Sequence, residues 1–170
     1  FTRIRQIDLG GLPARSIVPN GVCKDRTVLY LHGGAFVFYV PMHDRLVVPF
    51  CRAARSAVIV PEYRLAPEHP YPAALEDCLT AYCCLLQGGT DPSRLIIAGD
   101  SAGGGLAVAL LLKLREKNLP MPRLTVLISP WVDLSCEGHG SIVRNKDLDW
   151  ITPEASLQMA RHYVRHGTLK

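Results

Sequence analysis

The sequence lacks long apolar runs, clusters of basic residues and any secretory signal at its start. Its longest apolar stretch, residues 106–112, is far shorter than the roughly 20 residues that cross a bilayer. The 19 basic and 15 acidic residues are spread along the chain, unlike the basic patches that bind phosphate backbones. We therefore expect no membrane span and no nucleic-acid partner.

The cysteines also lack the spacing of a zinc or redox site. No C-x-x-C pair is present. Disulfide frameworks are typical of small secreted chains that cannot build a core, whereas 170 residues can bury one. We expect the cysteines to be packing residues in a reducing, cytoplasmic setting, and we predict no metal site. They are residues 23, 51, 78, 83, 84 and 136.

Composition and length predict one packed domain over residues 1–170. Hydrophobic residues make up 48% of the chain and charged residues 20%, which is ordinary for a globular protein. The chain starts at Phe1 without a methionine and reaches Lys170 in a helix-like stretch without a stop signal. These ends lead us to expect a fragment of a larger domain.

Apolar runs and helical segments alternate along the chain. A Gly-Gly pair at residues 10–11 supplies the positive φ of a tight turn and predicts an antiparallel hairpin. Further strands are expected at residues 27–31, 57–60, 94–98 and 124–128, and helices at 42–55, 73–86, 102–117 and 153–166. This alternation predicts an α/β fold, a mostly parallel sheet with helices on both faces. Ligands bind such sheets at the carboxyl ends of the strands.

One segment, residues 61–72, contains four prolines in twelve residues. Proline at this density excludes a helix or a central strand. A flexible linker is one interpretation. We favour a rigid, packed loop, because the aromatic and apolar side chains between the prolines gain from burial.

Ser101 lies in the pattern G-x-S-x-G between an expected strand and an expected helix. That context is typical of a serine nucleophile exposed on a sharp turn. Glycines at 103, 104 and 105 would weaken the first helical turn by about 1 kcal/mol each, so we expect them to permit a close backbone approach. Phosphate-loop and dinucleotide patterns are absent, and a purely structural glycine turn is the remaining alternative.

A second glycine pair, Gly33 and Gly34, follows the expected strand 27–31. With the N–H of Ala102, their backbone N–H groups are predicted to form an oxyanion hole, which stabilises the charge that develops in acyl transfer. His32 precedes the pair, and we expect it to hold the loop by hydrogen bonds and not to act as the base. The other histidines are not assigned.

Four segments together resemble one protein family. They are HGGA at residues 32–35, YRLAPEHPYPAA at 63–74, GDSAGG at 99–104 and SPWVDLS at 129–135. The chain resembles the hormone-sensitive lipase family of α/β-hydrolases, in its GDSAG esterase branch. The resemblance implies an α/β-hydrolase fold and a carboxylesterase or lipase-like activity on short to medium acyl esters, with no cofactor.

The resemblance also implies segments that this chain does not contain. Family members carry a helical cap upstream of the position of Phe1 and place the triad Asp and His after later strands. We therefore expect the N-terminal cap, the C-terminal strands and both triad partners to be missing, and the chain alone to be inactive or very weak. Asp133, Asp147 and His162 occur in the right order, but their spacing is too short for the family.

Two further expectations remain open at this stage. Trp131 and Asp133 follow a strand end and could border the acyl pocket, although a capping role for Asp133 is as well supported. A non-catalytic ligand-binding protein on the same fold, without the catalytic histidine, is the alternative to the enzyme. Oligomeric state is not predicted.

Overall fold

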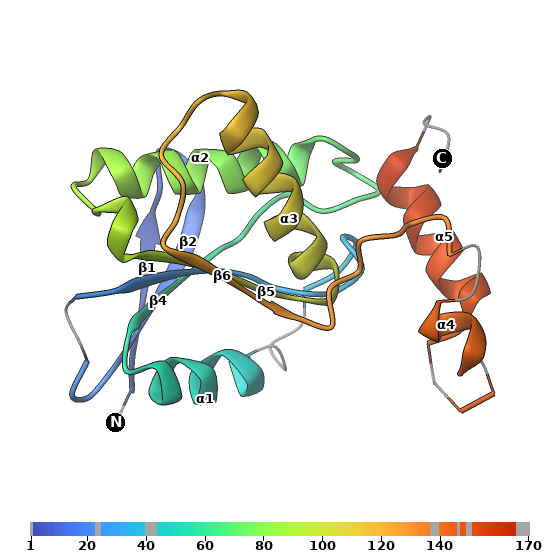
Figure 1. The fold of residues 1–170 in the computed structure, drawn as a ribbon, viewed down its shortest axis with the longest axis horizontal. Helices are drawn as coiled ribbons and strands as arrows, with labels where there is room; N and C mark the ends of the chain where they lie inside the picture. The colour runs from blue at the N-terminus through green and yellow to red at the C-terminus, as the bar shows by residue number, and fades with distance from the viewer. Residues whose placement is uncertain are drawn as a thin grey trace.

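The computed structural model describes residues 2–22, 25–39, 44–136, 140–145, 147–148 and 151–165. A six-stranded sheet runs through it in the order β1-β2-β4-β3-β5-β6 (Figure 1). The strands β3 to β6 pair in parallel, whereas β1 and β2 form an antiparallel hairpin that joins the edge of β4. The strands are β1 (Thr2–Asp8), β2 (Pro13–Pro19), β3 (Thr27–Leu31), β4 (Ala57–Pro61), β5 (Leu95–Asp100) and β6 (Leu124–Ile128).

Helices cover both faces of this sheet, with α1 on one side and α2 and α3 on the other (Figure 1). Val47 and Cys51 of α1 belong to one buried cluster, and Leu106 and Leu110 of α3 belong to the second. This confirms the predicted α/β architecture. The helices are α1 (Asp44–Ala54), α2 (Ala73–Gln87), α3 (Ser101–Glu116), α4 (Ser141–Arg144) and α5 (Pro153–Val164).

The predicted hairpin is confirmed by the turn between β1 and β2. Gly10 and Gly11 have φ values of +70° and +89°, a region that residues with a Cβ rarely adopt. The N–H of Gly11 donates to the Asp8 carboxylate at 2.8 Å, and the N–H of Leu9 donates to the Leu12 carbonyl at 2.8 Å. The two glycines therefore let the chain reverse and bury the leucines beside them.

Helix boundaries follow local capping. Thr152 accepts a hydrogen bond from the N–H of Ala155 at 3.2 Å, with Pro153 in the first turn, so α5 begins as predicted. Helix α3 begins at Ser101 itself, one residue before the prediction. Residues 40–43 and 166–170, at the predicted ends of two helices, lie outside the described residues. The short helix α4 was not predicted.

The proline-rich segment, residues 61–72, is packed as expected. Tyr63 is 3% exposed and Ala66 is 1% exposed. Asp77 of α2 accepts hydrogen bonds from the backbone N–H of Arg64 at 2.8 Å and from its guanidinium at 2.8–3.1 Å. This fork-like pairing fixes the segment against α2, and it keeps the loop close to the carboxyl end of β4.

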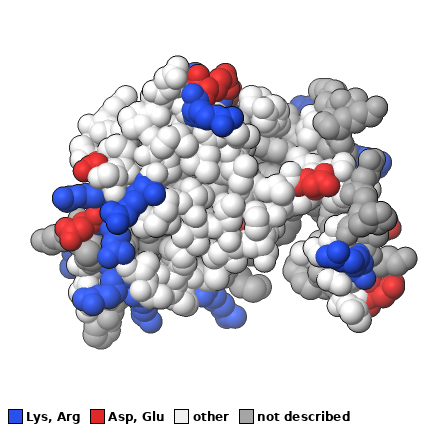
Figure 2. All heavy atoms as spheres, viewed as in Figure 1, with Lys and Arg blue, Asp and Glu red and all other residues white. Residues whose placement is uncertain are grey.

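Strand β6 forms one edge of the sheet and pairs, among the described residues, with β5 alone. Leu124 and Leu127 on this strand are 43% and 41% exposed. Figure 2 shows that the face over α3 and β6 carries few charged side chains. Within the described part of the chain, no helix combines the length and apolar character needed to cross a bilayer.

Candidate active site

Ser101 lies where β5 turns directly into α3. Its φ is +50°, a left-handed value that is uncommon for residues other than glycine. Its carbonyl oxygen accepts a hydrogen bond from the N–H of Trp131 at 2.8 Å, which ties the turn to the segment after β6. Backbone strain of this kind persists where the surrounding structure enforces it, and it is concentrated at functional sites.

The glycines around Ser101 allow close backbone contact on several sides. A Cβ on Gly99 would collide with the backbone of Gly103, and one on Gly103 would collide with the carbonyl oxygens of Leu31 and His32. A Cβ on Gly104 would lie 2.8 Å from that of Pro130. The prediction that close approach explains these glycines is therefore confirmed.

Gly33 is placed differently from the expectation that its N–H is a free oxyanion donor. Its N–H donates to Oδ1 of Asp100 at 3.0 Å. That carboxylate lies directly over the glycine, because a Cβ at residue 33 would collide with Oδ2 of Asp100. In this structure the N–H of Gly33 is therefore hydrogen-bonded to Asp100 and is not free to donate to a substrate oxygen.

The two peptides that follow, Gly33–Gly34 and Gly34–Ala35, direct their carbonyl groups to partners inside the loop. The Gly33 carbonyl faces Nδ1 of His32 at 2.6 Å, and the Gly34 carbonyl accepts from the N–H groups of Val37 and Phe38 at 3.0 Å. In a trans peptide the N–H points opposite to the preceding carbonyl. The N–H groups of Gly34 and Ala35 therefore point away from these internal partners.

Among the described residues, no group accepts a hydrogen bond from the N–H of Gly34, Ala35 or Ala102. Ala102 lies in the first turn of α3, where N–H groups have no partner within the helix. Ala35 was missed by the sequence analysis, which considered only the two glycines. The sequence signal for Ala35 was its place as the next residue of the same motif. The structure adds that its φ is +53°.

His32 is 2% exposed and holds this loop by several contacts. The Tyr63 hydroxyl donates to the His32 carbonyl oxygen at 2.6 Å, and the two rings are stacked. Burial raises the pKa of Tyr63 well above its ordinary value, so its hydroxyl stays protonated and able to donate. This arrangement agrees with the expected structural role of His32.

No described histidine hydrogen-bonds the Ser101 hydroxyl. His69 and His162 are exposed on the surface. His43, His139 and His166 lie outside the described residues. No group of three or more His, Cys, Asp or Glu side chains within the described ranges is arranged to hold a metal ion.

Asp133 stabilises the turn that follows β6. Its Oδ1 accepts hydrogen bonds from the N–H of Ser135 at 3.0 Å and from the Ser135 hydroxyl at 2.7 Å. Its carbonyl oxygen accepts from Nε1 of Trp131 at 2.8 Å. These contacts give Asp133 the capping role that the sequence left as one alternative. Asp147 lies in an exposed turn.

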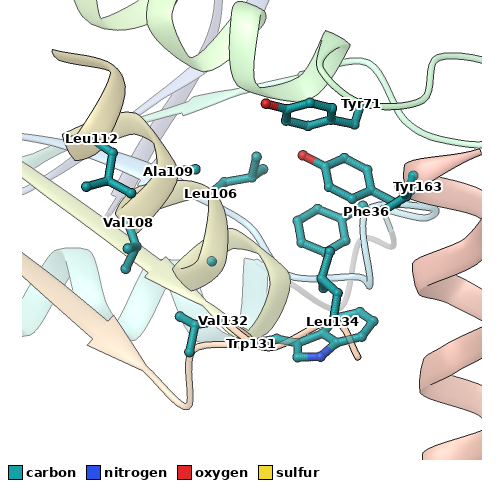
Figure 3. A pocket seen from close by; sticks show the side chains of 12 residues that line it. Phe36, Tyr71, Leu106, Val108, Ala109, Leu112, Trp131, Val132, Leu134 and Tyr163 are labelled. Carbon is teal, nitrogen blue, oxygen red and sulfur yellow. The ribbon is translucent and has the colours of Figure 1, made fainter. Parts of the chain in front are cut away.

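An apolar cavity of about 350 Å³ lies beside Gly105, one helical turn after Ser101. Figure 3 shows its aromatic wall, to which Phe36, Tyr71, Trp131 and Tyr163 contribute from four different segments. Phe36 stacks on Tyr163 with ring centroids 4.0 Å apart. The cavity is open, and the rest of its lining comes from the apolar face of α3, from Val132 and Leu134 after β6 and from Val164 of α5.

Comparison with known proteins gives a consistent result. A model of the α/β-hydrolase fold family matches residues 28–170. An acetyl-hydrolase of Streptomyces hygroscopicus is 42% identical over 166 residues, which cover 91% of this chain and 55% of that protein. A carboxylesterase/phospholipase of Mycobacterium tuberculosis is 45% identical over 146 residues, which cover 85% of this chain and 39% of that protein.

Comparison with solved structures points to the same family. The crystal structure of an esterase from the bacterial hormone-sensitive lipase family superposes with a TM-score of 0.94 at 38% identity, covering 99% of this chain and 57% of that chain. This chain therefore spans about half the length of the relatives it matches. The family resemblance of its four motifs is confirmed: the chain belongs to the hormone-sensitive lipase family of α/β-hydrolases.

Proposed function

We propose that this chain provides the nucleophile and the oxyanion hole of a serine carboxylic ester hydrolase. The observation that carries the proposal is the position of Ser101, held at positive φ between β5 and the amino end of α3. Neighbouring N–H groups and the helix dipole favour negative charge at that point. The names of the relatives, which include an acetyl-hydrolase and a carboxylesterase, support the same reaction class.

The reaction proceeds in two steps. Oγ of Ser101 attacks the ester carbonyl carbon, and the carbonyl oxygen becomes an anion that accepts hydrogen bonds from the N–H groups of Gly34, Ala35 and Ala102. The carbon–oxygen bond to the alcohol then breaks, the alcohol leaves with the proton taken from Ser101, and an acyl-enzyme remains. Water hydrolyses this ester by the same route. The base and its orienting acid are assigned to no residue of this chain.

The substrate class in this proposal is a small ester with a short to medium acyl chain. Support comes from the apolar cavity beside the site, which Phe36 and Trp131 line. We also propose that residues 1–170 form part of one catalytic domain. A cytoplasmic location is supported by the described cysteines, which are free thiols at residues 51, 78, 83, 84 and 136.

The test is hydrolysis of p-nitrophenyl butyrate by the full-length protein that the complete gene encodes. We expect Ser101→Ala to lower kcat by at least about 10⁴-fold, as removal of a triad serine does elsewhere. Ser93→Ala is the matched control, since Ser93 lies in an exposed turn before β5. Residues 1–170 alone should hydrolyse p-nitrophenyl butyrate only very weakly.

A fluorophosphonate, which phosphonylates activated serines, separates the two candidate functions. Labelling at Ser101 with turnover supports the hydrolase. Undetectable turnover and no labelling of a folded protein would refute it and favour the non-catalytic ligand-binding protein.

A further inference from the structure

Asp100, the residue between Gly99 and the nucleophile, joins the two halves of the site. Its Oδ1 accepts two hydrogen bonds at 3.0 Å, one from the Tyr30 hydroxyl and one from the N–H of Gly33. Tyr30 belongs to β3 and is fully buried. A single carboxylate oxygen on β5 therefore holds both the body of β3 and the loop that follows it.

The sheet register explains how Asp100 reaches both groups. Strands β3 and β5 are parallel neighbours, and Leu31 pairs with Gly99. Asp100 follows Gly99 in β5, and His32 and Gly33 follow Leu31 at the end of β3. The Asp100 side chain thus reaches across to the first peptide beyond the strand. At Gly33 the absence of a Cβ leaves room for the carboxylate.

We propose that Asp100 is a positioning residue that sets the oxyanion loop relative to Ser101. Once the N–H of Gly33 is fixed by Oδ1, the following peptides are oriented by their carbonyl partners, and the N–H groups of Gly34 and Ala35 face outward. The carboxylate acts through Gly33 and does not touch substrate. This inference rests on the proposed function, because it concerns the same oxyanion hole.

A positioning role has a specific kinetic signature. Oxyanion donors act most strongly on the charge that develops in the transition state, and less on the bound ester. Loosening the loop should therefore lower kcat and leave KM nearly unchanged. The affinity for a boronic acid, which forms a tetrahedral adduct with the serine, should fall together with kcat.

The experiment compares Asp100→Ala and Asp100→Asn in the full-length protein, with p-nitrophenyl butyrate as substrate and butylboronic acid as inhibitor. For Asp100→Ala we expect kcat to fall about 10- to 100-fold, the scale of a small misplacement of catalytic groups. KM should stay within about 3-fold. Asparagine keeps an oxygen that accepts from both donors, so it should restore most of the lost kcat.

Asp91→Ala is the matched control, because Asp91 precedes the opposite end of β5 and accepts a backbone hydrogen bond from Ser93 at 2.8 Å. Its kcat should equal that of the wild type. Unchanged kcat in Asp100→Ala, or equal loss in the alanine and asparagine variants, overturns the inference. If Asp100→Ala does not fold, Asp100→Ser decides: its shorter side chain cannot hold both the Tyr30 hydroxyl and the N–H of Gly33 as the carboxylate does, and unchanged kcat in this variant overturns the proposal.

Labelling of the wild type by a fluorophosphonate keeps the two proposals separate. A folded wild type that is not labelled at Ser101 refutes the proposed function itself. A wild type that is labelled, with an Asp100→Ala variant that is labelled and turns over at the same rate, refutes only the role of Asp100.

Discussion

The aromatic ring of Tyr63 lies parallel to the imidazole of His32, with centroids 4.2 Å apart and an angle of 9° between the planes. The same tyrosine donates to the His32 carbonyl oxygen at 2.6 Å. The segment after β4 thus supports the loop after β3 through both a ring face and a hydroxyl. The proline-rich segment, although it carries no proposed catalytic group, is part of the framework of the site.

Tyr63→Phe should lower both stability and activity. It leaves the buried His32 carbonyl without its donor, which costs about 1–3 kcal/mol of unfolding free energy. We also expect kcat to fall by roughly 10-fold through displacement of the loop. Tyr82→Phe removes a similar bond, from the Tyr82 hydroxyl to the Pro120 carbonyl at 2.9 Å, away from the site. Urea unfolding measures the stability of both variants, and ester hydrolysis measures their kcat. We expect kcat to fall for Tyr63→Phe and not for Tyr82→Phe.

Gly103→Ala should destabilise the fold by about 3 kcal/mol, the upper range for insertion of a methyl group into a tightly packed region. The added Cβ meets backbone carbonyls of Leu31 and His32, which cannot move without shifting β3. Gly140→Ala is the control, because Gly140 has a φ of −60° and no atom of the described residues lies within 4 Å of its added Cβ. Equal stability of the two variants in urea would contradict the close-approach explanation.

Stability should fall at alkaline pH. Burial raises the pKa of Tyr30, Tyr63, Tyr163 and Cys78 above their ordinary values of 10.0 and 9.0, and raises that of Tyr82 to about 12. The unfolded chain therefore loses these protons first as pH rises. The stabilisation is complete below about pH 9, and above it each group removes up to about 1.4 kcal/mol per pH unit.

Urea unfolding between pH 8 and pH 11 measures this slope. Tyr82→Phe should make it shallower above pH 10. An unfolding free energy that stays constant over the whole interval would show that these groups titrate alike in both states.

The edge strand β6 should make the 170-residue chain prone to association when it is expressed by itself. An unpaired edge offers free backbone groups, and exposed leucines add an apolar surface. Leu127→Lys should raise the soluble fraction by about 2-fold or more. Leu148→Lys is a control, because Leu148 is more exposed but lies outside the sheet. Sedimentation of the two variants and the parent chain checks the expectation.

The sequence predicted the elements better than the contacts of the site. Apolar runs such as residues 57–60 and the glycine turn at residues 10–11 are local signals, and their boundaries agree with the structure to within a few residues. The engagement of Gly33 with Asp100 is not local. It depends on which strand lies beside β3, and the spacing of residues along the chain does not encode that neighbour directly.

The same bond also has a consequence for biosynthesis. Gly33 and Asp100 are separated by 67 residues, and ribosomes add about 5–20 residues per second. The nascent chain therefore carries β3, with its apolar side chains, for roughly 3–13 seconds before β5 can emerge beside it. During that interval the strand depends on α1, β4 or a chaperone for cover, and slower translation between these positions should increase losses to aggregation.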